Sequence, residues 1–348
     1  MTQHPAQHVV HPAGGAVAPP ARRLTVFGLG GTISMTSGDS GGAVPALSAE
    51  QLIAAVPGLR DTGIHVEVED LRRVPGSSLG FDDLAALSDA IGRRLDQGAD
   101  GIVITQGTDT IEETAYLLDL AHDRPEPVVV TGAMRNPTMA GPDGPANLLA
   151  AVRTAASPQA RDLGVVVVFA DEIHAATRVR KTHSTSVSAF RSDNGGPLGY
   201  VVEGHPRVLN RPSERTVFPP AGPHRRTAEV GLVTMGLGDT GWWLNGADRL
   251  DGLVVAGFGA GHVPARLVDA LAGVASRIPV VLSTRTGAGP VLARTYAYPG
   301  SESDLLSRGL IPSGFLDPLK ARLLLHHLVA TGHDHTAVRA AFQQATTR

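Results

Sequence analysis

Short runs of β-branched residues alternate along the chain with stretches that carry apolar residues at helical spacing, and this alternation restricts the possible folds more than any other feature. The runs have the length of strands that are buried on both faces. They lie at residues 24–27, 101–105, 127–131 and 165–169. Helical spacing is found between them, at residues 81–95, 111–121 and 146–156. This order predicts an α/β fold with a mostly parallel sheet flanked by helices.

A stretch rich in proline and arginine interrupts the alternation at residues 206–227, and its composition resists both helices and central strands. The alternation resumes at residues 230–235, 252–256, 264–275, 279–283 and 318–331. Because 348 residues exceed the usual size of one hydrophobic core, we expect two α/β domains joined by this linker. The expected ranges are 1–23 for a disordered leader, 24–205 for the larger N-terminal domain and 228–348 for the smaller C-terminal domain.

Composition and charge exclude several classes of function. The net charge is −3 and both signs are scattered, so no basic region would attract nucleic acid or an anionic membrane. The absence of cysteine rules out disulfides, a thiolate nucleophile and thiolate metal sites. No stretch reaches the roughly 20 apolar residues that span a bilayer, and no secretion signal is recognisable. We therefore expect a cytoplasmic protein whose partner is a small molecule.

Histidine is frequent near the C-terminus, at His326, His327, His333 and His335. No H-E-x-x-H motif and no group of carboxylates accompanies these residues. The sequence therefore predicts no metal site.

Two threonines stand in glycine-containing turns directly after predicted strands. The two segments are Leu29-Gly30-Gly31-Thr32-Ile33 and Gln106-Gly107-Thr108-Asp109-Thr110. A dinucleotide-binding turn is disfavoured, because Ile33 occupies the position of the third glycine of that fingerprint. Two interpretations stay open: helix capping by each threonine, or presentation of both hydroxyls at the carboxyl edge of one sheet, where α/β folds bind ligands. Thr110 and Glu113 have the spacing of a capping box, which leaves Thr108 and Asp109 free to face a ligand.

Several further segments occur in one order along the chain and together carry a resemblance. They are residues 30–33, 105–116, 130–135, 143–148, 180–182 and 196–199. With these segments the chain resembles the bacterial asparaginase/glutaminase family, amidohydrolases that use a threonine nucleophile. The resemblance implies a two-domain α/β fold, a homotetramer built from tight dimers, an amino-acid substrate, and neither a metal nor an organic cofactor.

Position by position, the resemblance implies that Thr32 is the nucleophile and attacks the carbon of the side-chain amide. It also implies that Thr108, Asp109 and Lys181 form a hydrogen-bonded group beside that amide. A threonine hydroxyl is hardly ionised at neutral pH and must lose a proton as it attacks, whereas the departing amine must gain one. A partly buried lysine that is bound to a threonine can relay such a proton. The alternative for Lys181 is an exposed surface cation.

The two charged ends of an amino acid need their own partners. Asp109 suits the α-ammonium group. For the α-carboxylate, the resemblance points to a Gly-Ser segment at residues 75–78, in which Ser77 is favoured over Ser78; the alternative is an ordinary Pro-Gly turn. Gly31 and Gly107 complete the expected substrate-binding positions.

One departure from the family pattern concerns activation of the nucleophile. Many members carry a tyrosine in the loop after the nucleophile, supported by a glutamate of a neighbouring subunit, but residues 35–45 contain no tyrosine. Around the position of that glutamate the chain has Tyr296 and Tyr298. We hypothesise that one of these tyrosines enters the site from another subunit. The alternative is that both lie in a loop or at a sheet edge without a role in the reaction.

The sequence therefore predicts hydrolysis of L-asparagine to L-aspartate and ammonia through a threonyl acyl-enzyme. A preference for glutamine stays open, because a single methylene group distinguishes the two substrates. A non-catalytic amino-acid sensor that keeps the pocket is a further alternative. An ammonia-producing subunit of a tRNA-dependent amidotransferase is disfavoured, because the chain lacks a basic region for RNA.

Overall fold

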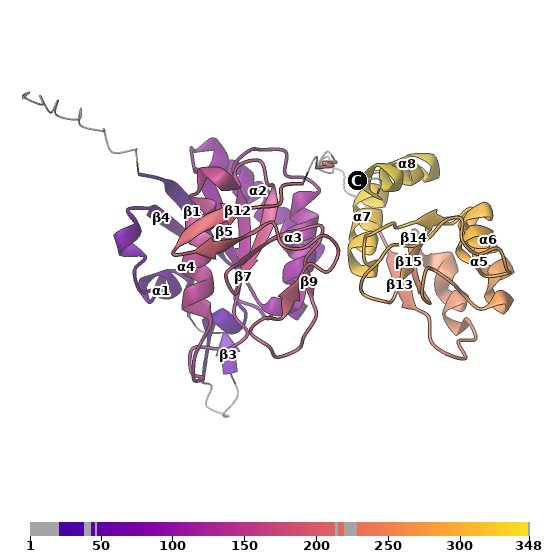
Figure 1. The fold of residues 1–348 in the computed structure, drawn as a ribbon, viewed down its shortest axis with the longest axis horizontal. Coiled ribbons are helices and arrows are strands. Elements are labelled where there is room, and N and C mark those ends of the chain that lie inside the picture. Colours follow the sequence, from indigo (N-terminus) through magenta and orange to yellow (C-terminus); the bar gives the residue numbers. More distant parts are fainter. Residues whose placement is uncertain (1–20, 38–42, 46, 213–214, 219–227, 347–348) are drawn as a thin grey trace, which may run out of the picture.

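The computed structural model describes residues 21–37, 43–45, 47–212, 215–218 and 228–346. It contains two α/β parts that lie next to each other, each built around its own sheet (Figure 1). The N-terminal part has an eight-stranded sheet and the C-terminal part a four-stranded sheet. The predicted fold class is confirmed. The expected leader lies almost entirely outside the described residues.

The larger sheet has the strand order β12-β11-β8-β7-β6-β5-β1-β4. Its parallel strands are β1 (Arg23–Gly28), β4 (His65–Asp70), β5 (Gly101–Thr105), β6 (Val128–Thr131) and β7 (Val165–Phe169). Antiparallel pairs add β8 (Glu172–Ala175), β11 (Gly199–Val202) and β12 (His205–Val208). The four predicted strands correspond to β1, β5, β6 and β7. Every residue of β5, β6 and β7 is buried, which explains why these strands read as apolar runs.

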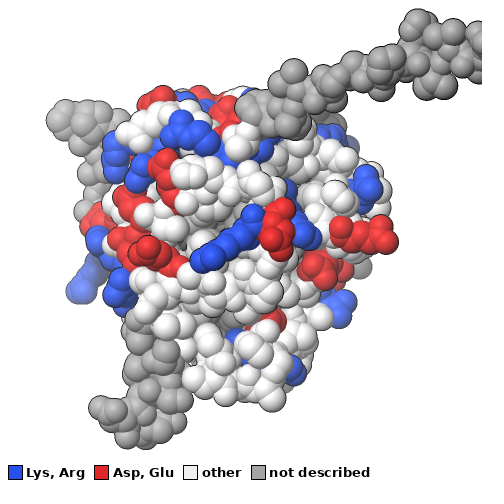
Figure 2. All heavy atoms as spheres, turned by 90° about the vertical axis from the view of Figure 1, so that its left-hand side faces the viewer, with Lys and Arg blue, Asp and Glu red and all other residues white. Residues whose placement is uncertain are grey.

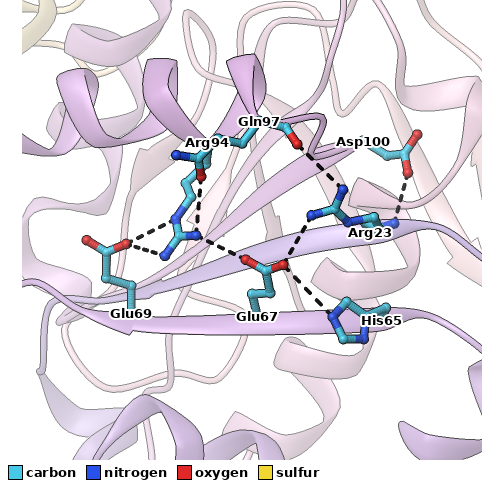
Figure 3. Close-up of polar contacts among 7 residues, drawn as sticks. All are labelled: Arg23, His65, Glu67, Glu69, Arg94, Gln97 and Asp100. Atoms are coloured by element: carbon cyan, nitrogen blue, oxygen red, sulfur yellow. Dashed lines mark hydrogen bonds and ion pairs between the residues drawn. The ribbon is translucent and has the colours of Figure 1, made fainter.

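The edge strand β4 is not predicted, because its sequence alternates valine with charged residues and the strand is only half-buried. Glu67 and Glu69 of β4 bind the guanidinium group of Arg94 at 3.0 and 2.9 Å (Figure 3). Glu67 also pairs with Arg23 of β1 at 3.3 Å. Such charged side chains hinder the pairing of an edge strand with a second sheet. The face of the molecule that carries β4 mixes both signs of charge (Figure 2).

Helices cover both faces of the larger sheet. On one face, α2 (Phe81–Asp96) and α3 (Ile111–Asp119) pack against Ile102 and Ile104 of β5. On the other face, α4 (Gly144–Ala155) and the short α1 (Ala49–Ala54) pack around residues such as Val103. Since neighbouring residues of a strand point to opposite faces, β5 contributes to both cores. The three predicted helices of this part begin and end within two residues of α2, α3 and α4.

The smaller sheet is parallel, in the order β13-β14-β15-β16. Its strands are β13 (Val230–Thr234), β14 (Gly252–Gly257), β15 (Val280–Thr284) and β16 (Ile311–Pro312). Its helices are α5 (Val268–Ala275), α6 (Glu302–Ser307), α7 (Pro318–Ala330) and α8 (His335–Thr346). The helix predicted at residues 264–275 begins with a 3-10 turn and becomes α-helical only at Val268. The sequence does not predict β16 and α6, which are short, and it does not predict α8.

Helix α7 lies where the two parts meet (Figure 1). One apolar cluster joins Leu324 of α7 and Val254 of β14 to Tyr116 of α3, so this helix packs against its own sheet and against the N-terminal part. The residues expected as a linker begin in β12, an edge strand in which Pro206 is tolerated. Residues 219–227 of that segment lie outside the described residues. Within the described ranges, no helix is long and apolar enough to cross a membrane.

Candidate active site

Three turns meet at the carboxyl edge of the larger sheet. They follow the neighbouring strands β4, β1 and β5 and contain Gly76, Gly31 and Gly107. A Cβ atom on Gly31 would lie 2.0 Å from the amide nitrogen of Gly107, and one on Gly76 would lie 2.8 Å from the carbonyl oxygen of Gly107. Only glycine permits backbones to approach so closely. The turns that carry Thr32, Ser77 and Thr108 are therefore packed against one another.

The first of these turns presents Thr32. Gly30 and Gly31 have φ values of 95° and 86°, in the left-handed region that glycine adopts without strain. Thr32 follows as the first residue of a short 3-10 helix, and Ser34 of that helix donates a hydrogen bond from its hydroxyl to the carbonyl of Gly31 at 2.8 Å. Thr32 is half-buried. Within the described part of the chain, its hydroxyl has no hydrogen-bond partner.

The amine of Lys181 joins the second turn. Lys181 Nζ donates to Thr108 Oγ1 at 2.9 Å and to Asp109 Oδ1 at 2.8 Å. Lys181 comes from β9 (Arg180–Lys181), which pairs with β10 (Phe190–Arg191), and its side chain is only 15% exposed. Thr108 is buried, whereas the side chain of Asp109 is 64% exposed. The structure thus brings three of the expected residues together, with the amine sheltered and the carboxylate facing outward.

The third turn carries the two serines. Ser77 and Ser78 belong to the 3-10 turn Gly76–Ser78 and are exposed at the same sheet edge. The hydroxyl of Thr110 donates to the carbonyl of Gly76 at 3.0 Å and thereby ties this turn to the turn after β5. The prediction that Thr110 forms a capping box is wrong, because its side chain makes no capping hydrogen bond to α3.

Two buried residues of the site have no signal in the sequence. Gln106 donates from its side-chain amide to the carbonyl of Gly107 at 3.3 Å and to the hydroxyl of Thr110 at 3.2 Å. Glu112 accepts a hydrogen bond on Oε1 from the backbone nitrogen of Lys181 at 3.2 Å. Burial raises the pKa of the Glu112 carboxyl. Both residues hold the backbone around the Lys181, Thr108 and Asp109 side chains.

The turn after β6 closes another side of the site. The carboxylate of Asp143 accepts hydrogen bonds from the backbone nitrogens of Met134 and Arg135 at 3.0 and 2.8 Å. Helix α4 starts at the next residue, Gly144, with Pro145 in its first turn. A Cβ atom on Gly132, at the start of this turn, would lie 3.5 Å from Cγ2 of Thr108. The β6 turn therefore contacts the threonine that binds Lys181.

Tyr296 and Tyr298 lie in the C-terminal part, between β15 and α6, and are 43% and 47% exposed. Their ring contacts are with each other and with His262. The hydroxyl of Tyr298 is 2.9 Å from His262 Nδ1, and Nε2 of the same imidazole is 3.2 Å from Oε2 of the buried Glu302. Among the described residues, no hydrogen bond or ion pair joins this Tyr-His-Glu chain to the turns that carry Thr32, Ser77 and Thr108. Among the described residues, no group of three or more side chains is arranged to hold a metal ion.

The hydroxyl of Thr108, the amine of Lys181 and the carboxylate of Asp109 lie together at one edge of the sheet. Comparison with known proteins shows to which class of protein the chain belongs. The family model described as asparaginase, N-terminal, matches residues 23–214. The model described as glutaminase/asparaginase C-terminal domain matches residues 229–342. The protein is an amidohydrolase. It belongs to the asparaginase family.

Individual relatives cover nearly the whole chain. A probable L-asparaginase of Deinococcus radiodurans is 38% identical over 92% of this chain and 97% of its own length. A glutaminase-asparaginase of Pseudomonas aeruginosa is 31% identical over 86% of this chain and 84% of its own. The crystal structure of a probable cytoplasmic L-asparaginase from Campylobacter jejuni superposes with a TM-score of 0.82 at 33% identity, covering 92% of this chain and 99% of that one.

Proposed function

We propose that the protein hydrolyses the side-chain amide of L-asparagine to L-aspartate and ammonia through an acyl-enzyme on Thr32. The observation that carries the proposal is the Lys181 amine, bonded to Thr108 at 2.9 Å and to Asp109 at 2.8 Å in the turn that packs against Gly31. The Thr32 hydroxyl has no hydrogen-bond partner among the described residues, and it follows Gly31, which packs against the turn that carries Thr108 and binds the sheltered Lys181 amine. This is the arrangement that attack on an amide and protonation of its nitrogen require.

The reaction divides into two steps. In the first, Thr32 Oγ1 bonds to the amide carbon and gives up its proton, the C–N bond breaks, and ammonia leaves with a proton relayed through Thr108 and Lys181. In the second, water bonds to the same carbon, the ester to Thr32 breaks, and the threonine regains its proton. The exposed carboxylate of Asp109 binds the α-ammonium group of the substrate, and Ser77 or Ser78 with the backbone of Gly31 and Gly107 binds its α-carboxylate.

The proposal extends to the assembly. We place the protein in the cytoplasm as a homotetramer of tight dimers, with the domain boundary in residues 206–227, and assign Tyr298 or Tyr296 of one subunit to the site of another. Tyr298 is favoured, because His262 and the buried Glu302 stand behind its hydroxyl as acceptors for a proton. Single Tyr298→Phe and Tyr296→Phe variants test this assignment. If both variants keep the turnover number of the wild type, neither tyrosine activates Thr32.

Release of ammonia from asparagine and from glutamine tests the reaction itself. We expect Thr32→Ala to abolish release, whereas Thr62→Ala, which removes a hydroxyl bonded only near the turn before β4, leaves it unchanged. The glutaminase-asparaginase of Pseudomonas aeruginosa named above makes a preference for glutamine the second candidate. A wild-type protein that binds asparagine in calorimetry but releases no ammonia would instead be an amino-acid sensor.

A further inference from the structure

A fully buried lysine stands at the junction of the two parts of the chain. Lys320 lies in the first turn of α7 and has no exposed surface. Removing an ammonium group from water is expensive unless other groups pair with it. The position of Lys320 therefore depends on the partners that surround its amine.

These partners come from both parts of the chain. Within the C-terminal part, Lys320 Nζ donates to Asp317 Oδ2 at 2.8 Å, and the other oxygen of Asp317 caps α7 by accepting from two backbone nitrogens. Across the junction, Lys320 Nζ donates to the carbonyl oxygen of Val179 at 2.5 Å and lies 3.5 Å from Glu112 Oε2. Asp317, at the start of the same helix, therefore holds the Lys320 amine, and the amine also contacts two groups of the N-terminal part.

Both partners across the junction are attached to the strand that carries Lys181. Val179 directly precedes β9, and Glu112 binds the backbone nitrogen of Lys181 through its Oε1 atom at 3.2 Å. Strand β9 has only two residues, and among the described strands it pairs only with the equally short β10. Such a short ladder fixes little by itself, so contacts from outside the pair decide where it lies. Lys320 binds Val179 directly on one side of the ladder residue Arg180, and on the other side it acts through Glu112, which binds the backbone nitrogen of Lys181.

Charge supports the same arrangement. Burial is the largest single influence on the Asp317 carboxyl and raises its pKa, but the charge and hydrogen bonds of Lys320, together with the charge of Arg180, lower the pKa overall. Burial raises the pKa of the Glu112 carboxyl, and Lys320 is the largest influence that opposes this rise. The ammonium group therefore stabilises the charged forms of two buried carboxylates, one from each part of the chain.

We propose that Lys320 is a positioning residue for the reaction. It holds β9 so that the amine of Lys181 stays within hydrogen-bond distance of Thr108, and it makes this distance depend on the docking of α7 against the N-terminal part (Figure 1). The role rests on the proposed function, because it acts only through Lys181. Lys320 itself touches neither the substrate nor the reacting atoms.

The test uses Lys320→Met, Glu112→Gln and the double variant in the full-length protein, with Arg339→Met as the matched control. Arg339 donates to the carbonyl oxygens of Gly309 and Leu310 within the C-terminal part and has no contact with β9. A displacement of about 1 Å at a reacting group lowers rates by about 100-fold. For Lys320→Met we therefore expect kcat for asparagine to fall by about 100-fold.

Binding separates a positioning role from a structural one. Because Asp109 and the serines are untouched, we expect Lys320→Met to change the dissociation constant of L-aspartate by less than about threefold, well below its effect on kcat. Hydrogen exchange at the backbone nitrogen of Lys181 should accelerate, while exchange in β5 stays unchanged. The double variant should be no slower than Lys320→Met, since both residues act through the same strand. Arg339→Met should lower the melting temperature and leave kcat unchanged.

Two results would overturn the assignment. One is a folded Lys320→Met protein with the kcat and the Lys181 exchange rate of the wild type. The other is an equal loss of kcat in Arg339→Met, which would make the effect general instability of the C-terminal part. If Lys320→Met does not fold, Glu112→Gln decides, because it keeps an acceptor for the Lys181 nitrogen but removes the charge facing Lys320. If the wild type releases no ammonia, the proposed function fails, and hydrogen exchange still tests the link between Lys320 and β9.

Discussion

Replacing Gly31 with alanine tests the packing of the turns that form the site. Gly31 has a φ of 86° and a ψ of −172°, a conformation almost restricted to glycine, in which a Cβ atom costs about 1–3 kcal/mol. The new Cβ atom would also lie 2.0 Å from the amide nitrogen of Gly107, and a backbone atom cannot rotate away. Overlap in a packed region costs a further amount of about 1–3 kcal/mol. The free energy of unfolding should therefore fall by about 2–6 kcal/mol.

Gly63→Ala is the matched control, because Gly63 has a φ of 67° and nothing lies within 4 Å of the Cβ position. Urea unfolding and ammonia release would be measured for both variants and the wild type at one protein concentration. We expect Gly63→Ala to lose about 1–2 kcal/mol and to keep its kcat. Gly31→Ala should lose more stability and nearly all of its kcat, since the turn of Thr32 must move away from the turn of Thr108. Equal losses of stability with an unchanged kcat would refute the contact between the two turns.

Three further predictions follow from buried or paired charges. Asp119 is buried and pairs with Arg215 at 2.7 Å, so Arg215→Gln leaves its carboxylate without a cation. In urea unfolding at pH 7, the free energy of unfolding should fall by about 3–5 kcal/mol. A smaller fall than that of Arg22→Gln, which breaks an exposed pair, would contradict this prediction. Burial lowers the pKa of His174 from 6.5 to about 4, so the unfolded chain binds a proton that the folded protein does not. When the pH falls from 6.5 to 4, the free energy of unfolding of the wild type should fall by about 3 kcal/mol more than that of His174→Gln. If the free energies of unfolding of the two proteins change with pH in parallel, His174 does not cause the loss. Asp109→Asn should change the free energy of unfolding by less than about 1 kcal/mol, because the carboxylate of Asp109 is largely exposed, yet it should raise the KM for asparagine. An unchanged KM would remove Asp109 from substrate binding.

The sequence predicts the strands that are buried on both faces and fails at strands that are not. β5 and β7 are continuous apolar runs because helices cover both of their sides. β4 alternates valine with charges because it is an edge strand, and its pattern is lost among the surrounding loops. The antiparallel strands β8, β11 and β12 have four residues each, too few for a periodic pattern to stand out.

Local sequence patterns predict the contacts of the site even less well than they predict the strands. Lys181 lies 73 residues from Thr108, and composition or periodicity cannot indicate that their side chains meet, so the prediction came from the resemblance to a family. Glu112 reads as part of a helix start, but its carboxylate binds the backbone of Lys181. Lys320 reads as an ordinary residue of a helix, although its amine binds a carbonyl 141 residues away. Contacts between distant segments become visible only when the chain is folded.

The most direct test of the central claim is to identify the residue that carries the acyl group. Wild type and Thr32→Ala would be mixed with asparagine, quenched in acid within the first turnovers, digested and analysed by mass spectrometry. We expect an aspartyl ester on Thr32 in the wild type and no ester in the variant. An ester on Thr108, or rapid release of ammonia from Thr32→Ala, would contradict it.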